Sequence, residues 1–369
     1  MLRPAAASAP GKVILMGEHA AVYHRPALVT ALDLRLSAKL VPIPRDVEIR
    51  LPQLEASRTL SWPEVRAYAR DRRAAWQRYM AAPSADAFRD VASGDDCHLV
   101  LVALGEAAEA FGVEPRGGLR LEIDSEIPRG AGFGSSAAAA VAILLAFSAA
   151  AGIGAEPRTL ETLALEIERR QHGNPSGVDT AAVLHGGLLW ARRRQGGPGD
   201  RTTGVELRPI AAKGTVLDGF RIFHSGAPAE DTGTVVEAVR RRRQTDPQGF
   251  EETLDEMSRH TERFVATVEG GGGPDDVLAA VRGFEHCLEI LGVVPEPVQR
   301  LIRRIEAAGG AAKISGAGAL TSAEAGSGAG SLLVYHPEPA RIGSWDFLAS
   351  LPSFPAALGA AGARLEAPP

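Results

Sequence analysis

Two carboxylates, Glu168 and Asp179, flank a turn rich in glycine, serine and proline, and this arrangement could carry chemistry. The segment reads Glu-Arg-Arg-Gln-His-Gly-Asn-Pro-Ser-Gly-Val-Asp. Acids on either side of a rigid turn can hold a divalent cation and handle a proton at one site. The same pair also fits the end of one helix followed by an aspartate that caps the next helix. The residues elsewhere in the chain distinguish a catalytic site from a simple helix boundary.

A glycine-rich segment, residues 126–137, lies between an expected strand and an expected helix. Glycine lets the backbone approach a ligand closely, and the first N–H groups of a helix point outward without partners. Together with the helix dipole they predict a phosphate site, where Ser135 and Ser136 add hydroxyls that could reach a metal ion. The segment has neither the lysine of a Walker loop nor the Rossmann spacing. A serine N-cap after a tight turn is the simpler alternative.

Residues 9–19 place a lysine, an acid and an imidazole around one expected strand. Lys12 starts the apolar run 12–16, after the turn-forming sequence Ala-Pro-Gly, and Glu18 and His19 follow the end of the run. A solvated surface lysine and a histidine satisfied within a turn remain the alternative interpretation.

Lysine is rare in this chain. The 40 Lys and Arg residues include only four lysines, Lys12, Lys39, Lys213 and Lys313. A compact ammonium group fills roles that a planar guanidinium cannot, so each remaining lysine raises the question of such a role. Lys12 and Lys313 both stand beside glycine-rich segments, which sharpens that question.

A second glycine-rich segment, residues 309–319, reads Gly-Gly-Ala-Ala-Lys-Ile-Ser-Gly-Ala-Gly-Ala. It is far from the first in the sequence, and two such segments in separate domains suggest a polyphosphate held between them. Taken alone, such a segment is more often a plain surface loop.

In combination, four segments resemble the GHMP small-molecule kinases. Three motifs follow in the expected order: Pro10-Gly11-Lys12 through Gly17-Glu18-His19, Pro128-x-Gly-Ala-Gly-x-Gly-Ser-Ser136, and Lys313-Ile-Ser-Gly-Ala-Gly318. The turn His172-Gly-Asn-Pro-Ser-Gly-Val-Asp179 is similar to the form found in mevalonate kinases. Homoserine kinases, galactokinases, phosphomevalonate kinases and diphosphomevalonate decarboxylases carry other residues there. The resemblance spans nearly the whole chain.

The resemblance implies phosphoryl transfer from ATP to the C5 hydroxyl of mevalonate, giving 5-phosphomevalonate in isoprenoid biosynthesis. By matching position, the catalytic residues would be Asp179, which takes or orients the hydroxyl proton, and Lys12, which keeps the aspartate ionised. Ser136 and Glu168 would hold Mg²⁺. The alternatives are another GHMP kinase, of the phosphomevalonate or mevalonate 3-kinase type, and a catalytically silent ligand sensor on the same fold.

The resemblance also implies ATP contacts in both glycine-rich segments, at Pro128, Gly130, Ala131, Gly132, Gly134, Ser135, Ser136, Gly316 and Gly318. Substrate contacts would come from Glu18, His19 and Thr232. The chain departs from the family pattern at Arg129, which adds a positive charge to the phosphate loop, and at residues 316–330, which are longer and less uniformly glycine than usual.

The implied fold is α+β, with two domains and the active site in the cleft between them. The N-terminal domain, residues 1–212, would be ribosomal protein S5 domain 2-like, and the C-terminal domain, residues 213–369, ferredoxin-like. Residues 45–96 match no motif and suggest an irregular or helical insertion that shapes the nucleotide pocket or a subunit contact.

Hydrophobic periodicity predicts the elements that must position these residues. The expected strands are 12–16, 27–40, 119–123, 186–191, 205–210, 220–224, 311–315 and 331–336. The expected helices are an alanine-rich one after residue 137 and those at 98–111, 159–170, 232–243, 251–268, 274–292 and 297–308.

Composition narrows the class of protein. A hydrophobic content of 45% and a charged content of 23% are typical of a soluble globular protein, and a net charge of -5 favours neither nucleic acid nor an acidic membrane as a partner. Residues 131–155 carry no charge, but their Ala, Gly and Ser content predicts a packed helix rather than a membrane span. Two cysteines make no disulfide framework. We expect a cytoplasmic enzyme that forms a homodimer.

Overall fold

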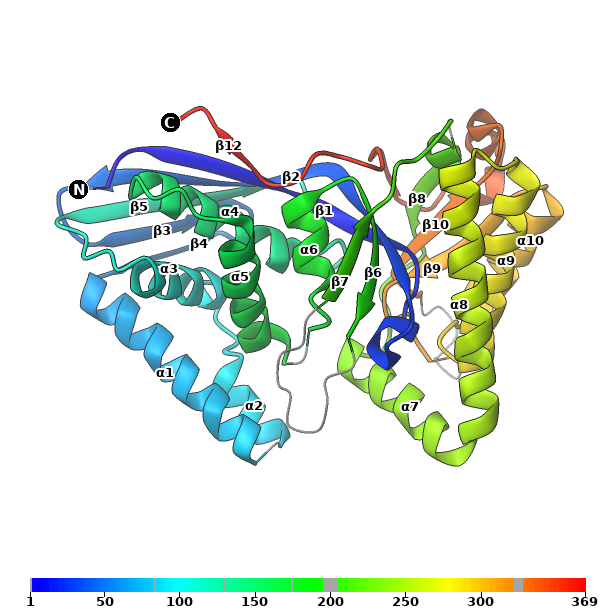
Figure 1. Cartoon of the computed structure of the whole chain (residues 1–369), viewed down its shortest axis with the longest axis horizontal. Helices are drawn as coiled ribbons and strands as arrows, with labels where there is room; N and C mark the ends of the chain where they lie inside the picture. Colours follow the sequence, from blue (N-terminus) through cyan, green and yellow to red (C-terminus); the bar gives the residue numbers. More distant parts are fainter. Residues whose placement is uncertain are drawn as a thin grey trace.

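The computed structural model describes residues 2–82, 84–128, 130–173, 175–194, 205–214, 216–320 and 328–369. Its strands form two sheets, one of eight strands and one of four. Figure 1 shows helices α1–α6 on one side of the large sheet, helices α8–α10 beside the small sheet, and α7 against one end of α8. The predicted mixture of helices and strands is therefore confirmed.

The large sheet is organised around one long strand. Its strands are β1 (Ala5–Met16), β2 (Ala27–Ile43), β3 (Val47–Leu51), β4 (Ala56–Leu60), β5 (Gly118–Ser125), β6 (Leu188–Arg193), β7 (Val205–Pro209) and β12 (Arg364–Glu366). The order β12-β1-β2-β5-β3-β4 forms its main path, and β6 joins β2 and carries β7. Strand β2 pairs with β6 through its first residues and with β5 through its last residues. It therefore connects the β6–β7 pair to the main path of the sheet.

Six helices cover this sheet: α1 (Trp62–Ala81), α2 (Ala85–Val91), α3 (His98–Ala110), α4 (Ser135–Ala150), α5 (Pro157–His172) and α6 (Val178–His185). Helix α4 is buried along most of its length, because its small side chains let it pack directly against β1 and β2. This confirms the packed helix expected from residues 131–155. No helix in the described ranges is long and apolar enough to cross a membrane.

The small sheet has the order β11-β8-β10-β9. Its strands are β8 (Phe220–His224), β9 (Ala311–Ser315), β10 (Ser331–Tyr335) and β11 (Ser353–Phe354), and its helices are α7 (Thr232–Thr245), α8 (Pro247–Gly270), α9 (Pro274–Leu291) and α10 (Glu296–Ala307). Helices α8 and α9 pack along each other, and each contributes a fully buried phenylalanine to the core, Phe264 and Phe284. Short 3₁₀ helices are η1 (Ala20–Tyr23), η2 (Pro52–Leu54), η3 (Val216–Gly219), η4 (Pro339–Ser344) and η5 (Asp346–Leu348).

The start of the first strand differs from the prediction. Residues 9–11, expected as a turn, lie inside β1, where Pro10 pairs with Arg35 and Gly11 with Leu32. The proline is accommodated because the pairing shifts register at this step, a common position for a residue without an N–H group.

Residues 45–96 are more regular than predicted. They form the hairpin β3–β4 and the helices α1 and α2, and β3 lies parallel to β5 within the large sheet. The strands were missed because both have only five residues. A capping box, in which the Ser61 and Glu64 side chains bond to each other's backbone, starts α1 and was a readable helix signal.

The end of the chain returns to the N-terminal sheet. Strand β12 pairs with β1, and the chain leading to it, red in Figure 1, runs back along the large sheet. Arg35 donates to the carbonyls of Ala361 and Gly362, and the Ser8 hydroxyl donates to Glu366. The division into residues 1–212 and 213–369 stays a prediction, but residues 364–366 lie on the sheet of the first part.

Candidate active site

The first glycine-rich segment forms a loop in left-handed conformations. Gly130, Gly132 and Gly134 have φ angles of 72°, 76° and 69°. Gly134 is the N-cap of α4, so the helix begins at Ser135, and neither serine caps it as the simpler interpretation supposed. The unpaired N–H groups and positive dipole of this helix end favour an anion in front of the loop.

Lys12 connects this loop to Asp179. Its backbone N–H donates to the carbonyl of Phe133 at 2.9 Å, and its side-chain stem packs against Gly134, where an added Cβ would lie 2.9 Å from Lys12 Cγ. Its ammonium nitrogen lies 3.1 Å from Asp179 Oδ1. Lys12 is only 5% exposed, so the surface-lysine alternative is wrong.

Asp179 stands in the first turn of α6, after the N-cap Gly177, so it is not itself the capping residue. The helix N-terminus and the Lys12 ammonium both stabilise its negative charge. Its side chain keeps 38% exposure, so it remains reachable by a ligand.

Glu168 is the second carboxylate of the opening pair, and it lies on α5 with only 3% exposure. Burial, followed by repulsion from Asp179, raises the pKa of Glu168 to about 8, although the Ser136 hydroxyl and Lys12 oppose the shift. Glu168 Oε1 has no hydrogen-bond partner within the described parts of the chain. The Ser136 hydroxyl shares a hydrogen bond of 3.0 Å with His172 Nε2.

This donor set fits a magnesium ion. Mg²⁺ prefers oxygen ligands and commonly takes only one or two carboxylates from the protein, with substrate phosphates completing its coordination. An unpartnered buried carboxylate oxygen beside a serine hydroxyl offers such ligands. In the described ranges, no group of three or more His, Cys, Asp or Glu residues forms a metal cluster.

The second glycine-rich segment contacts the N-terminal motif, and the adjacent strand β10 contacts the phosphate loop. The Ser331 hydroxyl donates to the carbonyl of Ala131 in the phosphate loop. On the other side, His19 Nε2–H donates to the carbonyl of Ala317 at 2.9 Å, and the Ser315 hydroxyl donates to the carbonyl of Ile14 at 3.1 Å. The segments that are distant in sequence are therefore neighbours in space.

Gly316 and Gly318 have φ angles of 110° and 72°, and a Cβ on Gly318 would collide with the carbonyl of Val293. Glycine is thus required for the path of the chain at Gly318. The departure noted at Arg129 and the middle of the long loop, residues 321–327, lie outside the described residues.

The three expected substrate residues occupy different environments. Glu18 and His19 are buried, at 2% and 8% exposure, and the Glu18 carboxylate faces the ammonium of Lys313. Thr232 is exposed at the first position of α7. Among the described residues, no hydrogen bond or ion pair joins Thr232 to the others, so its role as a substrate contact stays a prediction.

A pocket of about 640 Å³ opens beside the phosphate loop. Pro128, Ser135 and Ser136 line one side of it, and residues of the 45–96 segment, including Gln53 and Asp95, line another. This placement supports the nucleotide-pocket role that the sequence suggested for that segment.

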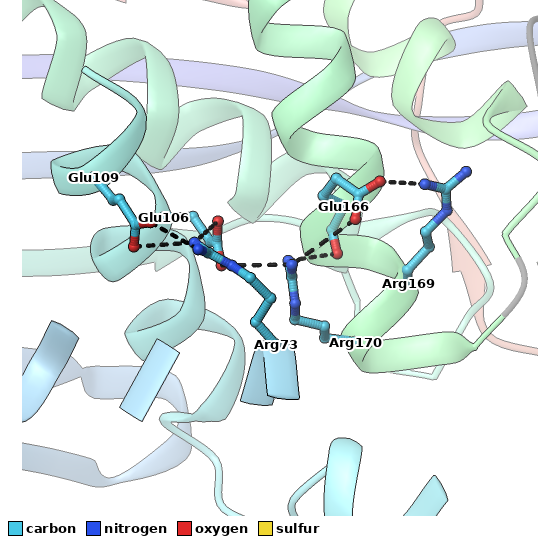
Figure 2. Close-up of polar contacts among 6 residues, drawn as sticks. All are labelled: Arg73, Glu106, Glu109, Glu166, Arg169 and Arg170. Atoms are coloured by element: carbon cyan, nitrogen blue, oxygen red, sulfur yellow. Dashed lines mark hydrogen bonds and ion pairs between the residues drawn. The ribbon is translucent and has the colours of Figure 1, made fainter. Parts of the chain in front are cut away.

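A network of ion pairs fixes α5, the helix that carries Glu168 (Figure 2). Arg170 is 3% exposed and lies 3.5 Å from Glu106 of α3, which in turn bonds Arg73 of α1 at 2.8 Å. Glu109 is a further partner of Arg73. The network continues along α5 itself, where Glu166 pairs with Arg169 and Arg170.

A histidine strengthens this connection. His98 Nε2–H donates to the backbone carbonyl of Arg170 at 3.3 Å, while Nδ1 accepts from the Tyr68 hydroxyl at 2.9 Å. The sequence analysis missed this network, because pairs between helices leave no local spacing signal. It also assigned no role to His172 and left the role of Lys313 open.

Comparison with known proteins agrees with this geometry. Residues 98–187 match the family model described as the GHMP kinases N terminal domain. A mevalonate kinase from Bos taurus is 30% identical over 343 residues, covering 84% of this chain and 83% of the relative. The solved mevalonate kinase of Methanococcus jannaschii superposes with a TM-score of 0.74 at 20% identity, covering 96% of this chain and 98% of that one. A Streptococcus pneumoniae phosphomevalonate kinase reaches 0.66 at 15% identity, covering 96% and 99%.

The relative at 30% identity, together with the matching family model, defines an enzyme of the GHMP kinase class, which transfers phosphoryl groups from ATP to small molecules. Within this class, the chain belongs to the mevalonate kinase family.

Proposed function

We propose that the enzyme phosphorylates the C5 hydroxyl of mevalonate with ATP and magnesium, and so supplies 5-phosphomevalonate to isoprenoid biosynthesis. The observation that carries this proposal is the pair of Lys12 and Asp179, 3.1 Å apart, beside a left-handed glycine loop. The turn between Glu168 and Asp179, in the form found in mevalonate kinases, supports the choice of substrate.

In the proposed reaction, the substrate hydroxyl oxygen attacks the γ-phosphorus while the bond to the β–γ bridging oxygen breaks and ADP leaves. Asp179 orients the hydroxyl and takes its proton as the new O–P bond forms, because the hydroxyl becomes acidic only as its oxygen bonds to phosphorus. Lys12 pairs with Asp179 and stabilises negative charge on the transferring group.

The phosphate loop, from Gly130 to Ser136, would hold the ATP phosphates with its backbone N–H groups. The second segment, through Gly316 and Gly318, would close over them, while Pro128 and the neighbouring pocket would hold the nucleoside. Ser136 and Glu168 would bind Mg²⁺, which neutralises charge on the β- and γ-phosphates when bound. The buried, unpartnered Glu168 oxygen supports this role.

An ADP-release assay with mevalonate, phosphomevalonate, homoserine and galactose tests the proposal. We expect turnover with mevalonate that depends on Mg²⁺. Turnover of phosphomevalonate instead of mevalonate would support the alternative that the enzyme is a phosphomevalonate kinase, since a phosphomevalonate kinase has a similar fold. Nucleotide binding by calorimetry without turnover of any alcohol would indicate the silent sensor.

A cytoplasmic location and a homodimer belong to the same proposal. Sedimentation velocity tests the oligomeric state, for which a single species at the monomer mass would contradict the dimer.

A further inference from the structure

Lys313 forms an ion pair in the interior of the protein. It is the third residue of β9 and is 0% exposed, and its ammonium donates to Glu18, which follows the end of β1 and is 2% exposed. The two residues are 295 positions apart, so this pair joins the small sheet to the N-terminal motif. Charges are rarely buried this completely without a structural or functional need.

The surroundings leave Glu18 as the charged partner of Lys313. A second buried acid, Glu285 of α9, accepts the backbone N–H of Ile314 at 3.0 Å. Burial raises the pKa of Glu285 well above its usual value, although Lys313 opposes the shift. The carboxylate that forms the ion pair with the Lys313 ammonium is that of Glu18. Burial also raises the pKa of Glu18, but both Lys313 and Lys12 counteract the rise.

The turn that contains Glu18 needs such an anchor. Gly17 has a φ angle of 110° and packs closely against Ala27. A Cβ atom added to Gly17 would lie only 2.4 Å from the Cα atom of Ala27. His19 has a φ angle of 59°, which is unfavourable for a residue with a side chain. Conformations of this kind persist only where the surrounding structure enforces them.

We propose that Lys313 is a positioning residue that, by holding Glu18, fixes the 17–19 turn and orients His19 toward the alcohol substrate. Ala317, four residues after Lys313, accepts the His19 hydrogen bond, so the same segment holds the turn at two points. This inference deepens the proposed function and rests on it for the identity of the substrate.

The inference also accounts for lysine at this position in a chain dominated by arginine. The ammonium is enclosed between Glu18, the carbonyl of Ile314 and the ring of Phe284, whose centroid is 5.5 Å away. A planar guanidinium is larger than an ammonium, and Lys313 is fully buried, so an arginine at this position would have to displace the side chains around it.

Steady-state kinetics of four variants test the role of Lys313. We expect Lys313→Met and Glu18→Gln each to raise the KM for mevalonate about tenfold while the KM for ATP changes less than about twofold. The double variant should be no worse than either single one, because the two residues act as a unit. Lys313→Arg should not restore the KM. The control Lys213→Met, at an exposed position, should match the wild type.

Hydrogen–deuterium exchange without substrate separates this inference from the substrate assignment. We expect faster exchange in residues 17–25 of Lys313→Met and Glu18→Gln, and no change in Lys213→Met. If the wild type does not phosphorylate mevalonate, the proposed function is wrong. The exchange result still shows whether Lys313 fixes the 17–19 turn.

A folded Lys313→Met protein with wild-type exchange and a mevalonate KM within about twofold of the wild type would overturn the inference. Full rescue by Lys313→Arg would overturn it as well. Should Lys313→Met fail to fold, Glu18→Gln, which keeps the size of the side chain, decides by the same two measurements.

Discussion

The ion pairs of helices α1, α3 and α5 differ in kind from those of the candidate active site. In the network of Figure 2, arginines share several carboxylates, and Arg73 and Glu109 keep 32% and 48% exposure of their side chains. At the site, two lysines each pair with one acid, and Lys313 and Glu18 have side chains that are 0% and 1% exposed. The difference indicates that each arginine connects several carboxylates, on different helices or along one, whereas each of these lysines pairs with a single acid.

This difference between arginine and lysine follows from the chemistry of the two side chains. A guanidinium spreads its charge over five N–H donors, so it can connect carboxylates on different helices. An ammonium is a compact point charge, which suits a closed space beside a transferring phosphoryl group. The rarity of lysine in the sequence is therefore informative at positions 12 and 313.

The strongest test of the catalytic pair is Asp179→Asn. This change keeps the size of the side chain but removes both the negative charge and the proton acceptor, so we expect kcat to fall about 10³-fold. Circular dichroism should show an unchanged fold. The matched control is Asp255→Asn on the surface of α8, which should retain full activity. Comparable activity in both variants would remove Asp179 from the mechanism.

Exchanging the two basic residue types tests the comparison directly. Lys12→Arg should lower kcat about 10²-fold, because the larger group must displace Gly134 or Asp179. The reverse exchange in the network, Arg73→Lys, should leave kcat unchanged but lower the free energy of unfolding by about 1–2 kcal/mol, because an ammonium cannot keep the hydrogen bonds to both Glu106 and Glu109. Equal effects of the two exchanges on kcat would contradict the division between them.

Arg170→Met removes the buried arginine of the network and leaves Glu106 without that partner. We expect the free energy of unfolding in urea to fall by about 1–3 kcal/mol, because the buried Glu106 loses one of its two arginine partners and keeps Arg73. Adding Glu106→Gln should recover part of this loss. If the double variant is as unstable as the sum of the two single variants, the residues are not coupled.

The raised pKa of Glu168 predicts a pH dependence of stability in metal-free protein. Because the folded-state pKa of about 8 exceeds the ordinary glutamate value of 4.5, the folded protein binds more protons than the unfolded chain between these values. The contribution of Glu168 is fully present below about pH 4.5 and is lost as the pH rises through about 8.

Urea unfolding between pH 5 and pH 8 checks this sign. The difference in the free energy of unfolding between the wild type and Glu168→Gln should decrease as the pH rises. The control Glu252→Gln, at an exposed position, should parallel the wild type. A difference that is constant over this range would show that the pKa of Glu168 is not raised.

The sequence predicted most of the fold, because long periodic segments such as β2 and α5 carry their own signal. It failed where pairing depends on distant residues. Strand β12 has three residues and forms only through β1, and β3 becomes part of the sheet through its neighbour β5.

The candidate site was predictable to the level of motifs but not of contacts. Glycine spacing and the residues around it identified Lys12, Ser136, Glu168 and Asp179, and the structure gathers them at one place. The burial of Glu18 against Lys313 was not predictable, because nothing in a linear sequence indicates that residues 295 positions apart meet.

The central claim is that the Lys12–Asp179 pair directs the phosphoryl group to the primary hydroxyl. Phosphorus NMR of the product formed from ATP, Mg²⁺ and mevalonate tests this claim most directly. The wild type should give a phosphomonoester whose signal couples to the C5 methylene protons, and Asp179→Asn should give almost none. A phosphate on the tertiary 3-hydroxyl, or an undiminished C5 product from Asp179→Asn, would contradict the account.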